Sequence, residues 1–279
     1  MEKIRSQLRA AYRLIIFVTY MSCFLAQAYA IHFTTKDPDE RRRKFSTNVT
    51  KWARLGIPHF DISVNVINKP SDDEVFLYVG NHMGFLDILV IATIMPLSFV
   101  TSQEMRNTPI IGLIVEMAGC LFVDRRNRLK IQNEMAEMAQ TMKRGFRVVL
   151  YPEATSHNGE EVLPFKRTLI MSAAQAEVPI RAVVFNFVEV DGQEFSLKNR
   201  DRVCWYGDMT FLSSLWGSFT CSTIKTQVEF LDPYQINPAE ERAKIADRLH
   251  DQIADRFLAV KEKRNSAQRL EQALPKNGL

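Results

Sequence analysis

Short apolar segments alternate with longer amphipathic segments through most of the chain. Apolar runs or alternating apolar positions over roughly four to eight residues indicate strands, and apolar positions spaced three and four apart indicate helices. The segments expected to be strands are residues 60–66, 75–79, 99–101, 120–123, 148–151, 180–187, 203–206 and 225–231. The segments expected to be helices are residues 39–55, 85–95, 110–118, 128–144, 167–177 and 238–260. This alternation predicts an α/β fold with a mixed, largely parallel sheet flanked by helices.

The N-terminal segment is a candidate membrane anchor. Residues 14–31 carry no charged side chain and are just long enough to cross the ~30 Å hydrocarbon core of a bilayer as a helix. Basic residues flank this segment, and the larger basic cluster follows it, which favours a cytoplasmic position for the rest of the chain. A helix lying in the interface, a cleaved signal peptide ending at residues 28–30, and a buried helix of a globular domain are the alternatives.

The pattern divides the chain into three parts. Residues 1–58 are expected to form a membrane-associated helical segment, residues 59–263 one α/β domain, and residues 264–279 a polar tail. With 279 residues, of which 46% are hydrophobic and 24% charged, the chain can bury a sizeable core, so it is neither disordered nor fibrous.

Charge and cysteine content exclude further classes of protein. A net charge of +4 is too small to indicate a nucleic-acid partner, and it suits an anionic membrane surface or an anionic substrate. The four cysteines are scattered without the spacing of metal ligands. We therefore expect neither a disulfide framework nor a metal site.

The strongest chemical signal is the segment Gly-Asn-His-Met-Gly-Phe-Leu-Asp at residues 80–87, which follows an expected strand and opens a helix. His82 and Asp87 are five residues apart, so they can meet only if His82 lies in the turn and Asp87 in the helix. A carboxylate bound to one imidazole nitrogen would fix the tautomer and leave the other nitrogen free to take a proton. The pair predicts a general base for an alcohol, whereas a hydrogen-bonded structural histidine is the simpler alternative.

Polar and charged residues also follow two later strands. Arg125 comes after one strand, where a guanidinium group could hold a phosphate or carboxylate. Glu153 and Thr155 follow the next strand and precede Lys166. Because the carboxyl ends of parallel strands lie at one edge of a sheet, we expect Arg125, Glu153 and Thr155 at the same rim as His82. Taken singly, each segment is also explained as a solvated loop.

Four segments in this order resemble the conserved blocks of the glycerolipid acyltransferase family, which includes the 1-acylglycerol-3-phosphate acyltransferases. They are His-x-x-x-x-Asp at 82–87, Gly-x-x-Phe-x-x-Arg at 119–125, Tyr-Pro-Glu-Ala-Thr-Ser at 151–156, and Val-Pro-Ile-Arg at 178–181. The resemblance implies that His82 is the catalytic base and Asp87 its partner. It also implies that Arg125, Glu153 and Thr155 bind the acceptor.

The resemblance implies the substrates as well. Family members move a fatty acyl group from acyl-CoA or acyl carrier protein to the free hydroxyl of a lysophospholipid, and they need no metal or other cofactor. The first acceptor to expect is 1-acyl-sn-glycerol-3-phosphate, which gives phosphatidic acid.

The third block departs from the family's usual Phe-Pro-Glu-Gly-Thr-Arg-Ser. Ala154 replaces the glycine and Ser156 replaces the arginine, so a phosphate ligand is missing. This variant is similar to the branch that acylates lyso-ornithine lipids, whose acceptor has no phosphate. Arg125 and Lys166 could still bind a phosphate, so both acceptors stay open.

Cytosolic acyl donors favour a retained anchor, with the catalytic domain facing the cytoplasm at the bacterial inner membrane. The expected partners are membrane lipids, a lysolipid acceptor and an acyl thioester donor, with acyl carrier protein as one form of that donor. Two other functions are alternatives. A lipid hydrolase lacks support because no Gly-x-Ser-x-Gly segment is present. A non-catalytic peripheral membrane-binding protein would use the basic and amphipathic segments alone.

Overall fold

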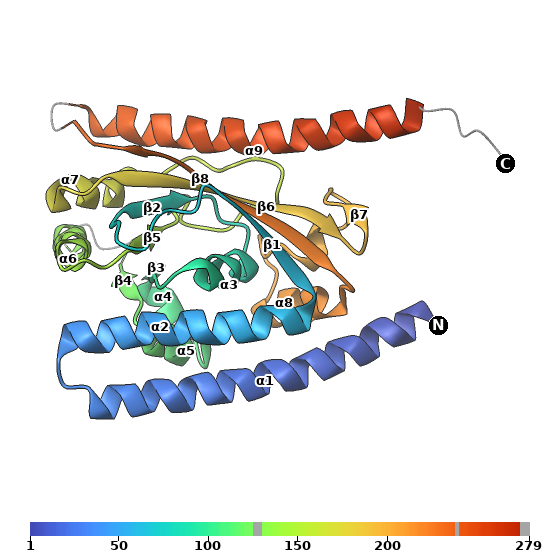
Figure 1. Ribbon diagram of the computed structural model, residues 1–279, viewed down its shortest axis with the longest axis horizontal. Helices are drawn as coiled ribbons and strands as arrows, with labels where there is room; N and C mark the ends of the chain where they lie inside the picture. The colour runs from blue at the N-terminus through green and yellow to red at the C-terminus, as the bar shows by residue number, and fades with distance from the viewer. Residues whose placement is uncertain (125–129, 238–239, 274–279) are drawn as a thin grey trace.

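A computed structural model describes residues 1–124, 130–237 and 240–273, with side chains as far as Phe257 (Figure 1). The helices are α1 (Glu2–Thr34), α2 (Pro38–Gly56), α3 (Phe85–Ile94), α4 (Gln103–Arg106), α5 (Ile111–Met117), α6 (Ile131–Lys143), α7 (Ser172–Ala176), α8 (Phe211–Thr220) and α9 (Arg242–Ala273). Short 3-10 helices are η1 (Ile57–Phe60), η2 (Leu169–Met171) and η3 (Arg200–Arg202). The strands are β1 (Ile62–Ile67), β2 (Leu77–Gly80), β3 (Ser98–Ser102), β4 (Leu121–Val123), β5 (Val148–Leu150), β6 (Ile180–Val190), β7 (Gln193–Glu194) and β8 (Ile224–Tyr234).

The strands form a sheet in the order β1-β8-β6-β2-β5-β3-β4, with β7 paired to β6. β6 runs antiparallel to β7 and β8, whereas the other neighbouring strands are parallel. The predicted mixed, largely parallel sheet is therefore confirmed. The central strand β2 is buried at every position, as expected for a strand that has cover on both faces.

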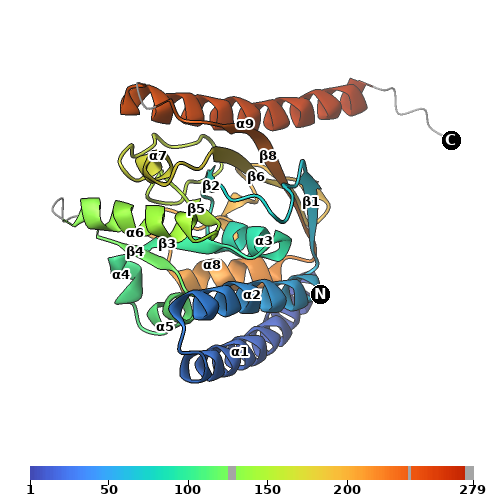
Figure 2. The ribbon, with the colours of Figure 1, turned by 60° about the vertical axis from the view of Figure 1, so that its left-hand side comes forward.

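Helices lie on both faces of this sheet (Figures 1 and 2). α9 crosses one face, where Ile245, Leu249, Ile253 and Phe257 are buried as their helical spacing predicted. α3 lies on the opposite face, with α2 and then α1 outside it. The expected start of the C-terminal helix at residue 238 falls outside the described residues.

Two predicted elements differ from the structure. Residues 203–206 do not form the expected strand, because this apolar stretch packs over the turn after β2 and not beside another strand: the backbone N–H of Trp205 donates to the Met83 carbonyl oxygen at 2.9 Å. The helix expected at 167–177 is shortened to η2 followed by α7. Apolar spacing alone does not distinguish a strand from a buried irregular segment.

The two predicted domain boundaries fall at different places relative to the helices. The boundary between residues 58 and 59 falls within η1, between α2 and the sheet. α9 continues through Ala273 and so includes the first part of the expected polar tail, whereas residues 274–279 lie outside the described part of the chain.

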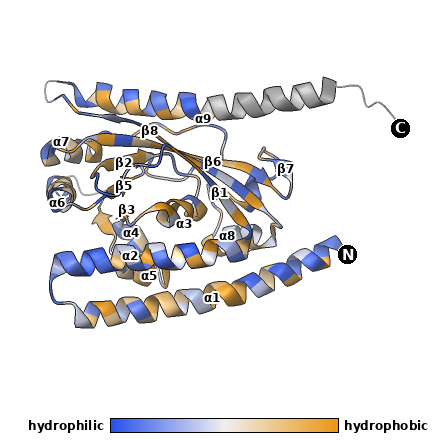
Figure 3. Ribbon diagram, viewed as in Figure 1, coloured by the Kyte–Doolittle hydropathy of each residue, from blue (hydrophilic) through white to orange (hydrophobic). Residues whose placement is uncertain are grey.

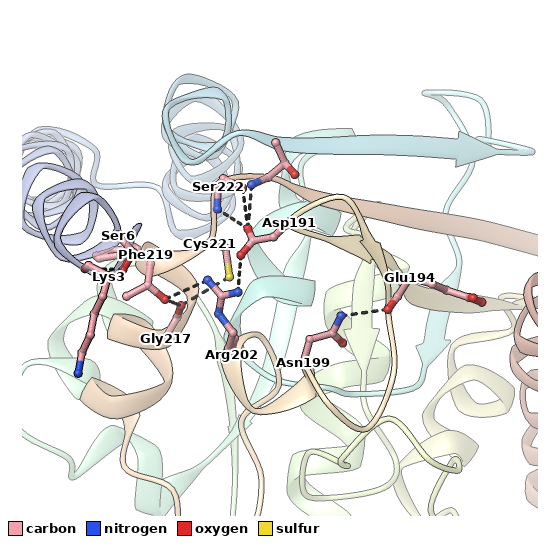
Figure 4. Close-up of polar contacts among 12 residues, drawn as sticks. Lys3, Ser6, Asp191, Glu194, Asn199, Arg202, Gly217, Phe219, Cys221 and Ser222 are labelled. Carbon is pink, nitrogen blue, oxygen red and sulfur yellow. Dashed lines mark hydrogen bonds and ion pairs between the residues drawn. The ribbon is translucent and has the colours of Figure 1, made fainter. Parts of the chain in front are cut away.

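The connection between β6 and β8, residues 191–223, is held at its base by an ion pair and several hydrogen bonds (Figure 4). Asp191 accepts hydrogen bonds from the backbone and side chain of Ser222 and forms an ion pair with Arg202 in η3. Asn199 donates to the Glu194 carbonyl oxygen at 3.0 Å. These contacts fix the segment that carries Trp205 over the turn after β2.

Candidate active site

The turn after β2 brings His82 and Asp87 together. Asp87 lies in the first turn of α3 and is fully buried. Its carboxylate oxygens are 3.0 and 3.1 Å from His82 Nδ1, and Oδ2 also accepts from the backbone N–H groups of Met83 (2.6 Å) and Gly84 (2.9 Å). An ionised carboxylate only accepts, so Nδ1 carries the proton in the neutral imidazole. Nε2 is therefore left as the basic nitrogen.

Gly84 is required for this turn. Its φ is +144°, and a Cβ added there would lie 3.0 Å from the Trp205 nitrogen. We expect Gly84→Ala to lower the free energy of unfolding by about 3 kcal/mol, because it combines backbone strain with a clash against backbone atoms. Urea denaturation measures this change. Gly145→Ala is the control, since Gly145 also has positive φ (+85°) but open space around it.

The control variant is expected to lose only about 1 kcal/mol, which is the strain of a left-handed alanine. An equal loss in the two variants would contradict the close packing of Trp205 on the turn.

Glu153 supports the His82 turn from the third block. Its side chain is 3% exposed, with Oε1 accepting from the His82 backbone N–H at 2.6 Å and Oε2 from that of Leu163 at 2.8 Å. Burial raises the pKa of Glu153 to about 8, against the lowering effect of these two hydrogen bonds. Both oxygens already bind the protein backbone, so the acceptor-binding role implied for Glu153 stays a prediction.

The other predicted site residues are distributed differently. Thr155 is exposed and lines the same cavity as His82. Lys166 is exposed, and its backbone N–H donates to the Pro152 carbonyl oxygen at 2.8 Å. Arg125 lies outside the described residues. The structure thus joins His82, Asp87 and Glu153 directly and places Thr155 at the same cavity.

Ala154 takes a conformation that suits glycine, the usual residue of this block. Its φ is +65°, in the left-handed region. Ala154→Gly is expected to raise the free energy of unfolding by about 0.5–1 kcal/mol, since the strain removed exceeds the entropy lost by glycine. Thermal unfolding followed by circular dichroism measures this gain, and a lower melting temperature would contradict it.

Two buried polar residues that the sequence did not single out complete the turn. Asn81 is fully buried, accepts from the Phe185 N–H at 2.8 Å and donates to the Phe185 carbonyl at 3.0 Å. The His157 backbone N–H donates to the His82 carbonyl at 2.8 Å. Burial lowers the pKa of His157 to about 4, and its Nδ1 accepts from the Gly159 N–H. Asn81 directly precedes His82, and that adjacency was the available signal.

An apolar cavity of about 520 Å³ opens beside His82. Its walls come mainly from α1, α2, α3, α5 and α8, with Tyr151, Thr155 and Trp205 near the histidine. No Lys, Arg, Asp or Glu is among the described residues that line it. The space can therefore hold a long apolar group with a reacting atom near His82 Nε2.

Known proteins are similar to this chain in sequence and in fold. Residues 62–186 match the family model described as Acyltransferase. The chain is 27% identical over 217 residues to the 1-acyl-sn-glycerol-3-phosphate acyltransferase of Neisseria meningitidis, covering 77% of this chain and 81% of that one. It is 27% identical over 201 residues to the lyso-ornithine lipid O-acyltransferase of Brucella abortus, covering 70% and 75%.

The 1-acyl-sn-glycerol-3-phosphate acyltransferase of Escherichia coli is 30% identical over 177 residues, which are 61% of this chain and 69% of that one. The fold is similar to the crystal structure of the 1-acyl-sn-glycerophosphate acyltransferase PlsC from Thermotoga maritima, with a TM-score of 0.67 and 19% identity over 94% of this chain and 98% of that one. The structural likeness supports the fold, and the sequence likeness shows the family. The chain belongs to the glycerolipid acyltransferase family and is an O-acyltransferase.

Proposed function

We propose that the protein moves a fatty acyl group from an acyl thioester to the free hydroxyl of a lysolipid, with 1-acyl-sn-glycerol-3-phosphate as the first acceptor and phosphatidic acid as the product. One observation carries the proposal: the buried Asp87 carboxylate orients His82 at the wall of an apolar cavity. The names of the relatives support the substrate class.

In the proposed mechanism, His82 Nε2 takes the proton of the acceptor hydroxyl while the hydroxyl oxygen attacks the thioester carbonyl carbon. The tetrahedral intermediate then expels the thiolate, and the imidazolium gives its proton to this thiolate. Asp87 stabilises the imidazolium between these steps. General-base catalysis of this kind supplies about 10²–10⁴-fold, and no acyl-enzyme is formed.

The cavity suits the acyl chain of the donor. Its walls are apolar, and burial of a methylene group contributes about 0.8 kcal/mol. The thioester then lies at His82, where the cavity meets the polar third block. Acyl-CoA and acyl carrier protein both offer this acyl thioester, and the mechanism needs no metal or other cofactor.

A specific contact supports lyso-ornithine lipid as a second candidate acceptor. Ser156, which stands where the usual block has arginine, donates its hydroxyl to the Trp205 carbonyl oxygen and so turns towards the protein. No Lys or Arg side chain takes its place among the described residues that line the cavity. An acceptor without phosphate fits this arrangement, whereas 1-acyl-sn-glycerol-3-phosphate relies on Arg125 and Lys166.

We also propose that α1 lies in the membrane interface, with the catalytic domain on the cytoplasmic side. α1 is apolar enough to cross a bilayer, with a mean hydropathy of 1.8 in its most apolar stretch, and Figure 3 shows the polar α2 beside it. Arg13 of α1 is buried and pairs with Asp61 at 2.5 Å. A crossing α1 would draw α2 and this ion pair into the hydrocarbon, at high cost.

The exposed side chains of α1 and of the helices beside it support an interfacial position. Large exposed apolar side chains gather on α1, at the start of α5 and on α8: Ile4, Leu8, Ile15, Val18, Ile110, Leu113, Leu212 and Trp216. Cysteines placed at the two ends of α1, with Cys23 replaced by serine, are expected to react with an impermeant maleimide from the same side of sealed vesicles. Labelling from opposite sides would contradict the proposal.

A substrate panel tests the function. Membranes containing the protein are incubated with acyl-CoA or acyl carrier protein thioesters and with each lysolipid, and the products are identified by mass spectrometry. The proposal predicts diacylated lipid, mainly phosphatidic acid. Exclusive acylation of lyso-ornithine lipid would select the second acceptor, free fatty acid would indicate hydrolysis, and liposome binding without any product would indicate a non-catalytic protein.

A further inference from the structure

Tyr151 lies against the His82 imidazole at the end of β5. The two rings stack with their centroids 4.5 Å apart and an interplanar angle of 19°. Tyr151 is 7% exposed, and the residue lines the same cavity as His82. It stands where the usual third block has phenylalanine. The aromatic ring is therefore common to both, and the hydroxyl is what this chain adds.

The Tyr151 hydroxyl is buried and has no partner at regular hydrogen-bond geometry among the described residues. Burial, and then the negative charge of Asp87, raise the pKa of Tyr151 well above its ordinary value. The phenol therefore stays protonated. Asp87, the carboxylate that contributes to this shift, contacts the same imidazole on which the Tyr151 ring stacks. A buried donor without a partner is unfavourable, which makes a hydrogen bond to this carboxylate the favoured arrangement.

We propose that Tyr151 is a positioning residue for acyl transfer, whose ring fixes the plane of the His82 imidazole and whose hydroxyl donates to Asp87. This donation weakens the attraction between the carboxylate and the protonated imidazole. The acidic limb of the rate against pH is then expected to lie lower than it would with phenylalanine at residue 151. The inference rests on the proposed role of His82.

Other titratable groups lie around the His82–Asp87 pair. Glu153 belongs to the third block, and His157 directly follows that block. Cys204 of the β6–β8 connection lies on the Asp87 side, and burial raises the pKa of its thiol and keeps it neutral. With Asp87 of α3, these are four groups. Tyr151→Phe leaves all four groups in place and adds no charge. A change in the pH profile of this variant therefore reports the phenol hydroxyl.

The test compares kcat/KM against pH for wild type, Tyr151→Phe and Tyr78→Phe. Tyr78 is a matched control, because it is 1% exposed and its hydroxyl also lacks a partner, but its ring packs on Phe76 and Phe230 away from the site. In Tyr151→Phe the acidic limb is expected to move up by about 0.5–1 pH unit, because an opposite charge beside a base raises its pKa.

Below that limb, activity of Tyr151→Phe falls roughly 3–10-fold, whereas its rate at the alkaline plateau stays within about twofold of wild type. Tyr78→Phe is expected to follow the wild-type profile. Tyr151→Leu, which removes the ring, is expected to lower kcat by roughly tenfold or more with little change in KM, because the imidazole loses its orientation.

Superimposed profiles for wild type and Tyr151→Phe would overturn the inference, as would an equal shift in Tyr78→Phe. Thermal unfolding checks that each variant is folded. If Tyr151→Leu does not fold, the pH profile of Tyr151→Phe alone tests the inference. Full activity of His82→Ala would overturn the proposed function instead. An inactive His82→Ala beside an unshifted Tyr151→Phe would overturn only the role of Tyr151.

Discussion

Asp87→Asn is expected to lower the rate of acyl transfer by about 10²–10⁴-fold. The wild-type carboxylate accepts from the Met83 and Gly84 N–H groups while it faces His82 Nδ1. If the asparagine oxygen stays on the two backbone donors, its NH₂ group faces Nδ1. The imidazole then places its proton on Nε2, and the nitrogen that meets the substrate can no longer act as a base.

The rate is measured with a radiolabelled acyl thioester and a saturating lysolipid. Asp247→Asn provides the matched control, because Asp247 is 64% exposed and 3.7 Å from Arg167, and this variant should keep the wild-type rate. A folded Asp87→Asn protein with a rate within about twofold of wild type would show that the carboxylate does not set the His82 tautomer.

The sheet and the histidine pair could be predicted because they depend on local signals. The buried run before residue 80 makes a strand, and the Gly residues make a turn, so the spacing of His82 and Asp87 leaves one way for them to meet. The structure has that arrangement. Local apolar spacing also located α9, since its buried face repeats at the helical period.

What the sequence did not reveal depends on contacts between distant segments. Residues 203–206 look like a strand because they are apolar, but they lie over the turn after β2, where the Trp205 N–H donates to the Met83 carbonyl oxygen. The spacing of the third block does not indicate that the Glu153 oxygens are occupied by the N–H groups of His82 and Leu163. In both cases the partner lies in a different segment of the chain. The periodicity of one segment carries no information about such a partner.

The polar residues around His82 illustrate the same limit. The sequence assigns no role of their own to Asn81 and His157, yet each is buried and ties the His82 turn to another segment: Asn81 to β6, and the His157 backbone to His82 itself. Tyr151 reads as the end of a buried strand, and only the stacked geometry shows its relation to His82. A buried polar side chain needs its partners to be known before its role can be argued.

The central claim is that His82 is the general base of acyl transfer to a lysolipid hydroxyl, and His82→Ala tests it. His82 contacts Asp87 and Tyr151 through its side chain, whereas its backbone bonds to Glu153 and His157 remain possible in the variant. We therefore expect a folded protein that lacks the imidazole but keeps the turn after β2. Its melting temperature and liposome binding should stay close to those of wild type.

His250→Ala is the matched control. His250 also has a carboxylate beside it, with Nδ1 3.0 Å from Asp251, but it lies on α9 and is not among the cavity residues. The deciding measurement is the initial rate of acyl transfer for wild type, His82→Ala and His250→Ala, each with the same thioester and lysolipid. We predict a fall of about 10²–10⁴-fold for His82→Ala and a wild-type rate for His250→Ala; a folded His82→Ala protein with the wild-type rate would contradict the claim.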